Sequence, residues 1–220
     1  MSVMIDIETL PDLDMPDDAR RALVAAKVPK NYKDAAKIEA WIASHADEAW
    51  RRQALDPLHG RILCIGVWDL EGHPTCLWPV DHAPGSLDAE REILHHLEGM
   101  LGRRAQKLVA HNGVAFDFPF LRKRAMKHGM YTLAKRMCQE KPWSETHGDT
   151  RVMWCQPSRP GAGSSLDALA EFFNIKRHNP ISGADVYDRW AAEDYVAIRK
   201  HVLDDVRVLG RLYQILQRCT

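Results

Sequence analysis

The chain has 220 residues, of which 45% are hydrophobic and 27% charged, an ordinary composition for a globular protein with one sizeable core. Its 30 Lys and Arg residues balance 30 Asp and Glu residues, so no global basic field indicates a nucleic-acid partner. Any polyanion would have to be attracted by a local basic surface, although the stretches Arg122-Lys123-Arg124 and Lys176-Arg177 are typical of solvated helix faces.

The cysteine pattern and the hydropathy of the chain indicate the cellular compartment. The five cysteines are odd in number and show no CxxC spacing, which argues against a disulfide framework and against a zinc knuckle. No stretch approaches the roughly 20 apolar residues of a membrane span, and the acidic N-terminus lacks the pattern of a signal peptide. We therefore expect a cytoplasmic protein with no membrane partner.

The first predicted element is a strand in "VMIDIETLPD", residues 3–12. Side chains alternate along a strand, so the apolar residues Val3, Ile5 and Ile7 point one way while Asp6 and Glu8 point the other. Acids are depleted in strands. The segment therefore has either a solvated face or a use for two negative charges.

A helical insertion is predicted next, over about residues 13–57. This connection is far longer than the usual few residues between neighbouring elements. Its apolar stripe of Trp41, Ile42 and Trp50 either packs on the main domain or offers a docking surface to a protein partner.

The remaining elements alternate between strand and helix patterns. The run at 61–80 predicts a hairpin around "EGHP", and "KLVAHN" predicts a buried strand that ends at the Asn112-Gly113 turn. Helices are predicted at residues 87–101, 116–129, 164–173 and about 193–217. This order favours an α/β fold with a mixed sheet flanked by helices, and one domain over residues 1–220.

Two further acids could join the first pair. Asp117 lies in "AHNGVAFDFPFL" where a helix begins, a common place for an N-cap, yet three phenylalanines surround it. On the last helix His201 and Asp205 are four residues apart and share a face, which by itself is worth only a few tenths of a kcal/mol. Asp204 points elsewhere, and we expect it to be solvated.

Three ordered motifs carry a family resemblance. They are "DIET" at the first strand, "HNGVAFDFPFL" in the middle and "IRKHVLDDVRVL" near the end, with "GDTRVMW", "SSLDALAEFFNI" and "DVYDRW" between the last two. Together they resemble the DEDD superfamily of 3′-5′ exonucleases, and specifically the exonuclease (proofreading) domain of family-B DNA polymerases. The resemblance covers nearly the whole chain except the insertion. It implies a ribonuclease H-like mixed sheet flanked by helices, with the helical insertion between strands one and two.

The resemblance implies that Asp6, Glu8, Asp117 and Asp205 bind two divalent cations, Mg²⁺ or Mn²⁺. Hard cations such as Mg²⁺ prefer oxygen ligands. Four carboxylates held together without a cation would raise one another's pKa values. Two cations about 3.5–4 Å apart stabilise both the attacking and the leaving oxygen of a displacement at phosphorus.

The third motif departs from the family pattern. One lineage of the superfamily has a Tyr four residues before the last Asp, and its sister lineage has a His five residues before it. Here His201 stands four residues before Asp205. With an ordinary pKa near 6.5, an imidazole is suited to take a proton from an attacking water, so we assign His201 as general base or water-orienting group. Tyr195, ten residues before Asp205, is a fallback.

Candidate substrate contacts lie within or next to the same motifs. Thr9 and Leu10 end the first motif, and Asn112 could contact substrate or hold its turn. Phe116, Leu10 and Trp143 are candidate stacking surfaces for a terminal base, although burial in the core is the alternative for each.

The sequence thus predicts a metal-dependent 3′-5′ exonuclease that acts on the 3′ end of single-stranded DNA. An exoribonuclease is an alternative of the same chemical class. A non-catalytic module that binds nucleic acid or protein on the same fold is the alternative from another class.

Overall fold

A mixed β-sheet forms the centre of the computed structural model, which describes residues 2–102, 107–138, 146–155, 163–179 and 181–219. Among these residues the strand order is β3-β2-β1-β4-β5. β1 is antiparallel to β2 and parallel to β4, β3 is antiparallel to β2, and β5 is parallel to β4. The strands are β1 Ser2–Leu10, β2 Arg61–Trp68, β3 Thr75–Leu77, β4 Lys107–Ala110 and β5 His147–Asp149.

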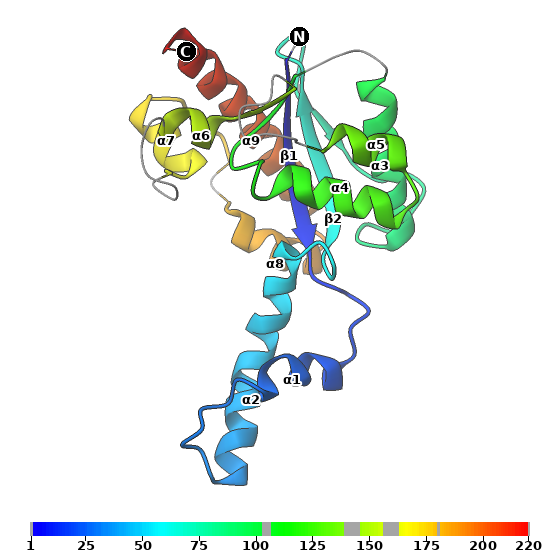
Figure 1. Cartoon of the computed structure of the whole chain (residues 1–220), viewed down its shortest axis with the longest axis vertical. Coiled ribbons are helices and arrows are strands. Elements are labelled where there is room, and N and C mark those ends of the chain that lie inside the picture. The colour runs from blue at the N-terminus through cyan, green and yellow to red at the C-terminus, as the bar shows by residue number, and fades with distance from the viewer. Residues whose placement is uncertain (1, 103–106, 139–145, 156–162, 180, 220) are drawn as a thin grey trace.

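Helices cover both faces of this sheet (Figure 1). They are α1 Asp17–Ala25, α2 Ala35–Arg51, α3 Leu87–Leu101, α4 Asp117–Lys127, α5 Tyr131–Arg136, α6 Thr150–Cys155, α7 Leu166–Phe172, α8 Val186–Ala191 and α9 Tyr195–Leu216, with short 3₁₀ turns η1 Arg52–Leu55, η2 Gly183–Asp185 and η3 Gln217–Cys219. Helices α3, α4 and α5 pack on one face, while α8 and α9 pack on the other. The predicted α/β fold, a mixed sheet with flanking helices, is confirmed.

β1 separates the two layers by the alternation of its side chains. Val3, Ile5 and Ile7 belong to the core shared with α3, α4 and α5. Met4 packs against α9 on the opposite face, and Glu8 contacts the same helix. The pairing of β1 with β2 is irregular between Glu8 and Thr9, where the register shifts by one residue. The acids predicted to share one face therefore lie on the side of the sheet that α9 covers.

Gly66 lets α9 lie directly on the sheet at the level of these acids. It pairs with Asp6 across the β1–β2 ladder. A Cβ atom at Gly66 would lie 2.7 Å from Val206 Cγ1 and 2.9 Å from the Val202 carbonyl oxygen, closer than side chains tolerate. The missing side chain thus sets how near α9 comes to β1.

The insertion between β1 and β2 forms an arm of α1 and α2 that extends away from the sheet (Figure 1). Trp50, at the base of the arm, is 2% exposed, donates its indole N–H to the Asp12 carbonyl at 2.8 Å and packs edge-on against Tyr187 of α8. Trp41 lies farther along α2, stacked on His45 at 4.1 Å. The predicted packing of the apolar stripe on the main body therefore holds for Trp50, and a protein partner for the remainder stays a prediction.

A buried ion pair fixes the chain where it returns from the arm. Arg124 on α4, fully buried, contacts both carboxylate oxygens of Glu90 on α3 at 2.7 and 2.6 Å. Its remaining nitrogen donates to the Pro57 carbonyl at 3.1 Å, and Glu90 accepts the Ile62 N–H at 2.9 Å. The expectation that this basic stretch is a solvated face is wrong for Arg124, because a buried carboxylate on a neighbouring helix holds it.

Across the described ranges, none of the helices combines the length and the apolar character that crossing a membrane requires.

Replacing Gly66 with Ala tests the close approach of α9. The added methyl group would overlap Val206 and Val202, so we expect the free energy of unfolding to fall by about 1–3 kcal/mol, measured by urea denaturation. Gly99→Ala is the matched control, because Gly99 lies in α3 with open space around its Cβ position. That substitution should raise stability by up to about 1 kcal/mol. Equal effects of the two changes would contradict the packing described here.

Candidate active site

A cleft of about 260 Å³ opens where β1 passes α9. It is formed by the second half of β1, the end of η1, the start of α4, and the segments around α7, η2 and α9. Its lining residues are Asp6, Ile7, Glu8, Thr9, Ala54, Leu55, Phe116, Leu166, Asp167, Arg177, Ser182, Gly183, His201 and Asp205. Residues nearly two hundred positions apart in sequence therefore share one cleft.

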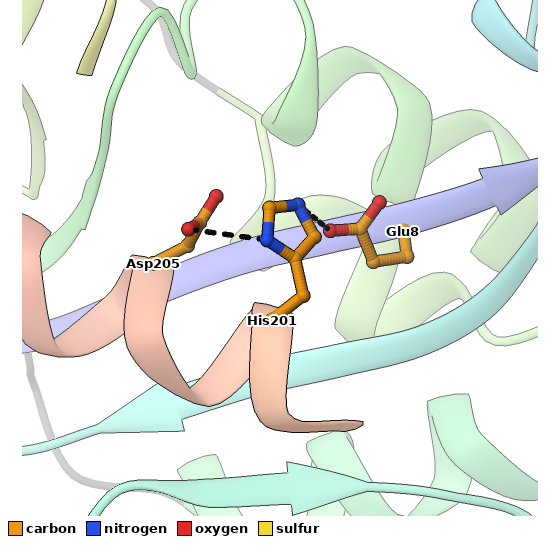
Figure 2. Close-up of side chains that lie close together, drawn as sticks. All are labelled: Glu8, His201 and Asp205. Carbon is orange, nitrogen blue, oxygen red and sulfur yellow. Dashed lines mark ion pairs between the residues drawn. The ribbon is translucent and has the colours of Figure 1, made fainter. Parts of the chain in front are cut away.

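At the centre of the cleft, an imidazole lies between two carboxylates (Figure 2). His201 Nε2 is 3.3 Å from Glu8 Oε1 on β1, and His201 Nδ1 is 3.7 Å from Asp205 Oδ1 one turn along α9. Donor atoms of Glu8, His201 and Asp205 all lie within 4.8 Å of one another. His201 is 3% exposed. The four-residue spacing thus turns both side chains toward β1.

Asp117 approaches the same strand from the other layer. It is the first residue of α4 and is 3% exposed, whereas the N-cap position is Phe116 and no side chain caps this helix. The backbone N–H groups of Asp117 itself and of Ile7, the residue between Asp6 and Glu8, act to lower the pKa of Asp117 against the larger effect of burial. The structural alternative for Asp117, an ordinary N-cap, is therefore wrong.

The carboxylates repel one another in a poorly solvated place. Burial, then the charges of Asp205, Glu8 and Asp117, raise the pKa of Asp6 well above its usual value. Burial, then Asp205 and Asp117, do the same to the pKa of Glu8. Burial raises the pKa of Asp117 to about 7, and it also raises the pKa of Asp205 against the opposing charges of His201 and Arg177. The four predicted acids thus form one electrostatic unit.

Arg177 is the site residue that sequence reasoning missed. Its Nη1 lies 2.7 Å from Asp205 Oδ1, and its Nε lies 3.1 Å from Asp167 Oδ1 in the first turn of α7. Burial opposes the charge on Arg177, but Asp205 and Asp167 outweigh burial and raise its pKa. The expectation of a solvated Lys176-Arg177 face is wrong for Arg177. No local signal could have found it, because its partners lie on two other helices.

Asp204 has a structural role. It is 5% exposed, accepts the N–H groups of His178 and Asn179 at 2.9 and 3.3 Å, and pairs with Arg207. The expectation that Asp204 is solvated is wrong, because it fastens the segment after α7 to α9.

The candidate substrate residues divide between cleft and core. Thr9 and Phe116 line the cleft, and the Phe116 ring rests against Phe120. Leu10 is fully buried among the residues that pack under α8 and α9, so in this structure it presents no face to a base, and the expectation for it is corrected. Asn112 has a positive φ of 64° and accepts a hydrogen bond from Arg151 at 2.9 Å, an arrangement that holds the turn. Trp143 lies outside the described residues, and Tyr195 packs against Trp78.

The donor set fits divalent cations that prefer oxygen ligands. Carboxylates of β1 and α9 line one cleft, and the charge of Asp117 on α4 acts on both β1 acids. Burial, together with the neighbouring negative charges, raises the pKa values of Asp6, Glu8 and Asp117, a cost that bound cations would offset. His201 Nδ1 is buried without a hydrogen bond from any described residue, so the site also holds a polar atom that awaits a partner.

Comparison with known proteins agrees with this architecture. A family model for the RNase H superfamily matches residues 52–217, most of the chain. The chain belongs to the RNase H superfamily. The RNase H-like fold is a nuclease fold, which implies a nucleic-acid partner. The predicted ribonuclease H-like fold is thereby confirmed. The matched range contains Asp117, His201 and Asp205 but leaves out β1, with Asp6 and Glu8.

A solved structure extends the likeness to β1 and the arm. The family B DNA polymerase from the hyperthermophilic archaeon Pyrobaculum calidifontis is similar with a TM-score of 0.61 and 18% sequence identity. The alignment covers 98% of this chain and 24% of the polymerase chain, so this RNase H superfamily member spans about a quarter of that polymerase's length. At this identity the likeness concerns the fold. No curated protein matches the sequence.

The raised carboxyl pKa values predict how pH affects the metal-free protein. A carboxyl group whose folded-state pKa lies above its unfolded value stabilises the fold at low pH, and that contribution is lost as pH rises through the folded value. For Asp117 the window runs from its ordinary value of 3.8 to about 7, at about 1.4 kcal/mol per pKa unit. We therefore expect urea unfolding in EDTA to show lower stability at pH 8 than at pH 5.5.

Asp117→Asn should remove a large part of that loss, and added Mn²⁺ should restore stability to the unsubstituted protein at pH 8. Asp81→Asn, which alters an exposed carboxylate outside the cleft, serves as the control and should keep the full pH dependence. A stability that rises between pH 5.5 and pH 8 in EDTA would contradict the electrostatic description of the cleft.

Proposed function

We propose that this RNase H superfamily member is a metal-dependent 3′-5′ exonuclease that hydrolyses single-stranded DNA from its 3′ end. The observation that carries the proposal is that carboxylates of β1 and α9 line one small cleft, close enough to Asp117 of α4 for its charge to act on both β1 acids. Such a cluster is electrostatically costly without cations and is suited to hold two of them.

In this proposal Asp6, Glu8, Asp117 and Asp205 hold two divalent cations, Mg²⁺ or Mn²⁺. When bound, the cation pair supplies charge stabilisation to the attacking and leaving oxygens of an in-line displacement at phosphorus. β1 keeps Asp6 and Glu8 on one rigid face, which supports accurate positioning of ligands.

We propose that His201 takes the proton of the attacking water. Its neighbours support this role, because a carboxylate beside an imidazole nitrogen fixes the ring and makes it a better base. The ring lies in the cleft beside the carboxylates and not at the surface. Tyr195 is no substitute, since it does not line the cleft among the described residues.

The substrate assignment rests on the size and lining of the cleft. A volume of about 260 Å³ lies below the range typical of drug-sized ligand sites and suits a terminal nucleotide better than a length of duplex. Phe116 offers a ring at the edge of the cleft on which an unpaired base could stack, and Thr9 offers a hydroxyl group.

Loss of one ligand tests the enzyme assignment. With Mg²⁺ or Mn²⁺ the purified protein should shorten a 5′-labelled single-stranded oligonucleotide stepwise and release nucleoside monophosphates. Asp6→Asn should lower the rate by more than about 100-fold, because the loss of an outer partner of a metal ligand alone costs 10- to 100-fold. The control Asp81→Asn should keep the full rate. Persistent activity in Asp6→Asn would contradict the proposal.

Matched substrates separate the alternatives in the same assay. Faster shortening of an RNA oligonucleotide of the same sequence would identify an exoribonuclease. Binding of either strand without cleavage, under both metals and over a range of pH, would identify a non-catalytic module. A 3′-phosphorothioate linkage should block the first step if degradation proceeds from the 3′ end.

Replacing His201 with Phe tests its assignment as the base. General acid–base catalysis typically contributes 10²- to 10⁴-fold, so kcat should fall by that range. The affinity for Mn²⁺, measured by isothermal titration calorimetry, should stay within about threefold of the original if the imidazole is not a ligand. A loss of Mn²⁺ affinity of tenfold or more would show instead that His201 coordinates the cation.

A further inference from the structure

Arg177 introduces a positive charge into a cleft otherwise governed by carboxylates. It lines the cleft together with Glu8, His201 and Asp205, and 21% of its side chain is exposed. Its shortest charge contact joins Nη1 to Asp205 Oδ1 at 2.7 Å. That oxygen is also the one that faces His201. The guanidinium therefore neutralises the same carboxylate oxygen that a bound cation would need.

The other acids near Arg177 depend on it less. Asp167 is 69% exposed, so water screens its charge. Asp204 lies 3.6 Å from Arg177 Nε but already has Arg207 and two backbone N–H groups. Asp205 differs from both. It lines the cleft, its side chain is only 16% exposed, and among the described residues it contacts no other Arg or Lys.

The contact between Arg177 and Asp205 is suited to exchange. Although Nη1 and Asp205 Oδ1 lie close together, neither atom has a well-aligned hydrogen bond among the described residues. An ion pair of this kind is held by charge and gives way to a competing charge more readily than a bidentate pair does.

The backbone around Arg177 is fixed, so the side chain alone would have to move. The Lys176 carbonyl accepts from Arg207 at 3.0 Å, and the His178 N–H donates to Asp204 at 2.9 Å. Both partners stand on α9, the helix that carries Asp205. The segment thus keeps Arg177 at the cleft, and an exchange of partners would require a rotamer change of its side chain alone.

We propose that Arg177 acts as an exchangeable cation: it neutralises Asp205 in the metal-free site, yields that carboxylate when a divalent cation binds, and then contacts the phosphate of the nucleotide. A divalent cation and a guanidinium on the same carboxylate oxygen repel each other, whereas a guanidinium and a phosphate form strong paired hydrogen bonds. Metal and nucleotide would therefore favour each other's binding through this one side chain. This inference rests on the proposed nuclease function and adds a residue that couples the two ligands.

Calorimetry on the full chain tests the exchange without any measurement of catalysis. Mn²⁺ alone is titrated into the original protein and into Arg177→Gln. Removal of the competing charge should tighten Mn²⁺ binding by roughly tenfold, within the 5- to 150-fold range of typical coupling. In saturating Ca²⁺, binding of the mononucleotide dTMP should weaken by about tenfold or more, the usual consequence of losing a charged hydrogen-bond partner.

Arg189→Gln is the matched control, because Arg189 lies on α8 outside the cleft lining, with 47% of its side chain exposed. It should change neither affinity. Circular dichroism and thermal denaturation show whether each variant is folded. If Arg177 only fastens the segment after α7, Arg177→Gln should lower the melting temperature and leave Mn²⁺ affinity unchanged or weaker, and that result would overturn the exchange.

Failure of this inference and failure of the proposed function are distinguishable. An original protein that binds Mn²⁺ and degrades DNA, but whose Arg177→Gln variant gains no Mn²⁺ affinity, overturns the exchange alone. An original protein that binds neither Mn²⁺ nor dTMP overturns both.

Discussion

Mutual repulsion among partly buried carboxylates is the constraint on which the site depends. Burial, and after it the charges of neighbouring carboxylates, raises the pKa values of Asp6, Glu8 and Asp117, and burial also raises the pKa of Asp205. A fold built only for stability would avoid this arrangement, since like charges in a low dielectric cost free energy. The rest of the molecule therefore has to hold these groups together against their repulsion until positive charge arrives.

Packing on both faces of β1 supplies that restraint. The apolar face of the strand is buried under α3, α4 and α5, and α9 presses on the opposite face. Gly66 has no side chain to keep α9 away, and Asp117 lies close enough to β1 for the backbone N–H of Ile7 to lower its pKa. Arg124 and Glu90 fix the return from the arm, so the end of η1 can line the cleft. Stability and site geometry thus come from the same contacts.

The nitrogen-bearing side chains of the cleft contact the carboxylates from two different elements. His201 lies between Glu8 and Asp205, and Arg177 meets Asp205 from the segment after α7. Arg177 is a long side chain on the segment between α7 and η2, whereas His201 and the carboxylates stand on helices and a strand. This division suits a site whose anionic ligands must stay in place while protons, cations and a phosphate come and go.

The sequence by itself determined which residues share a face of a strand or helix, because apolar and polar side chains recur at fixed spacings. Alternation along β1 fixed which residues face α9, the four-residue spacing placed His201 and Asp205 on one face, and the helix at 87–101 followed from its apolar period. Short elements such as β5 were not predicted, because three residues are too few to show a periodic pattern of apolar side chains.

Tertiary structure alone decided the contacts between distant segments. It gave Asp204 its contact with the segment after α7 and brought Arg177 to Asp205. None of these could be predicted from the sequence, because burial and ion pairing depend on which elements meet in space. The periodicity of a sequence predicts only which face of its own helix or strand a side chain occupies.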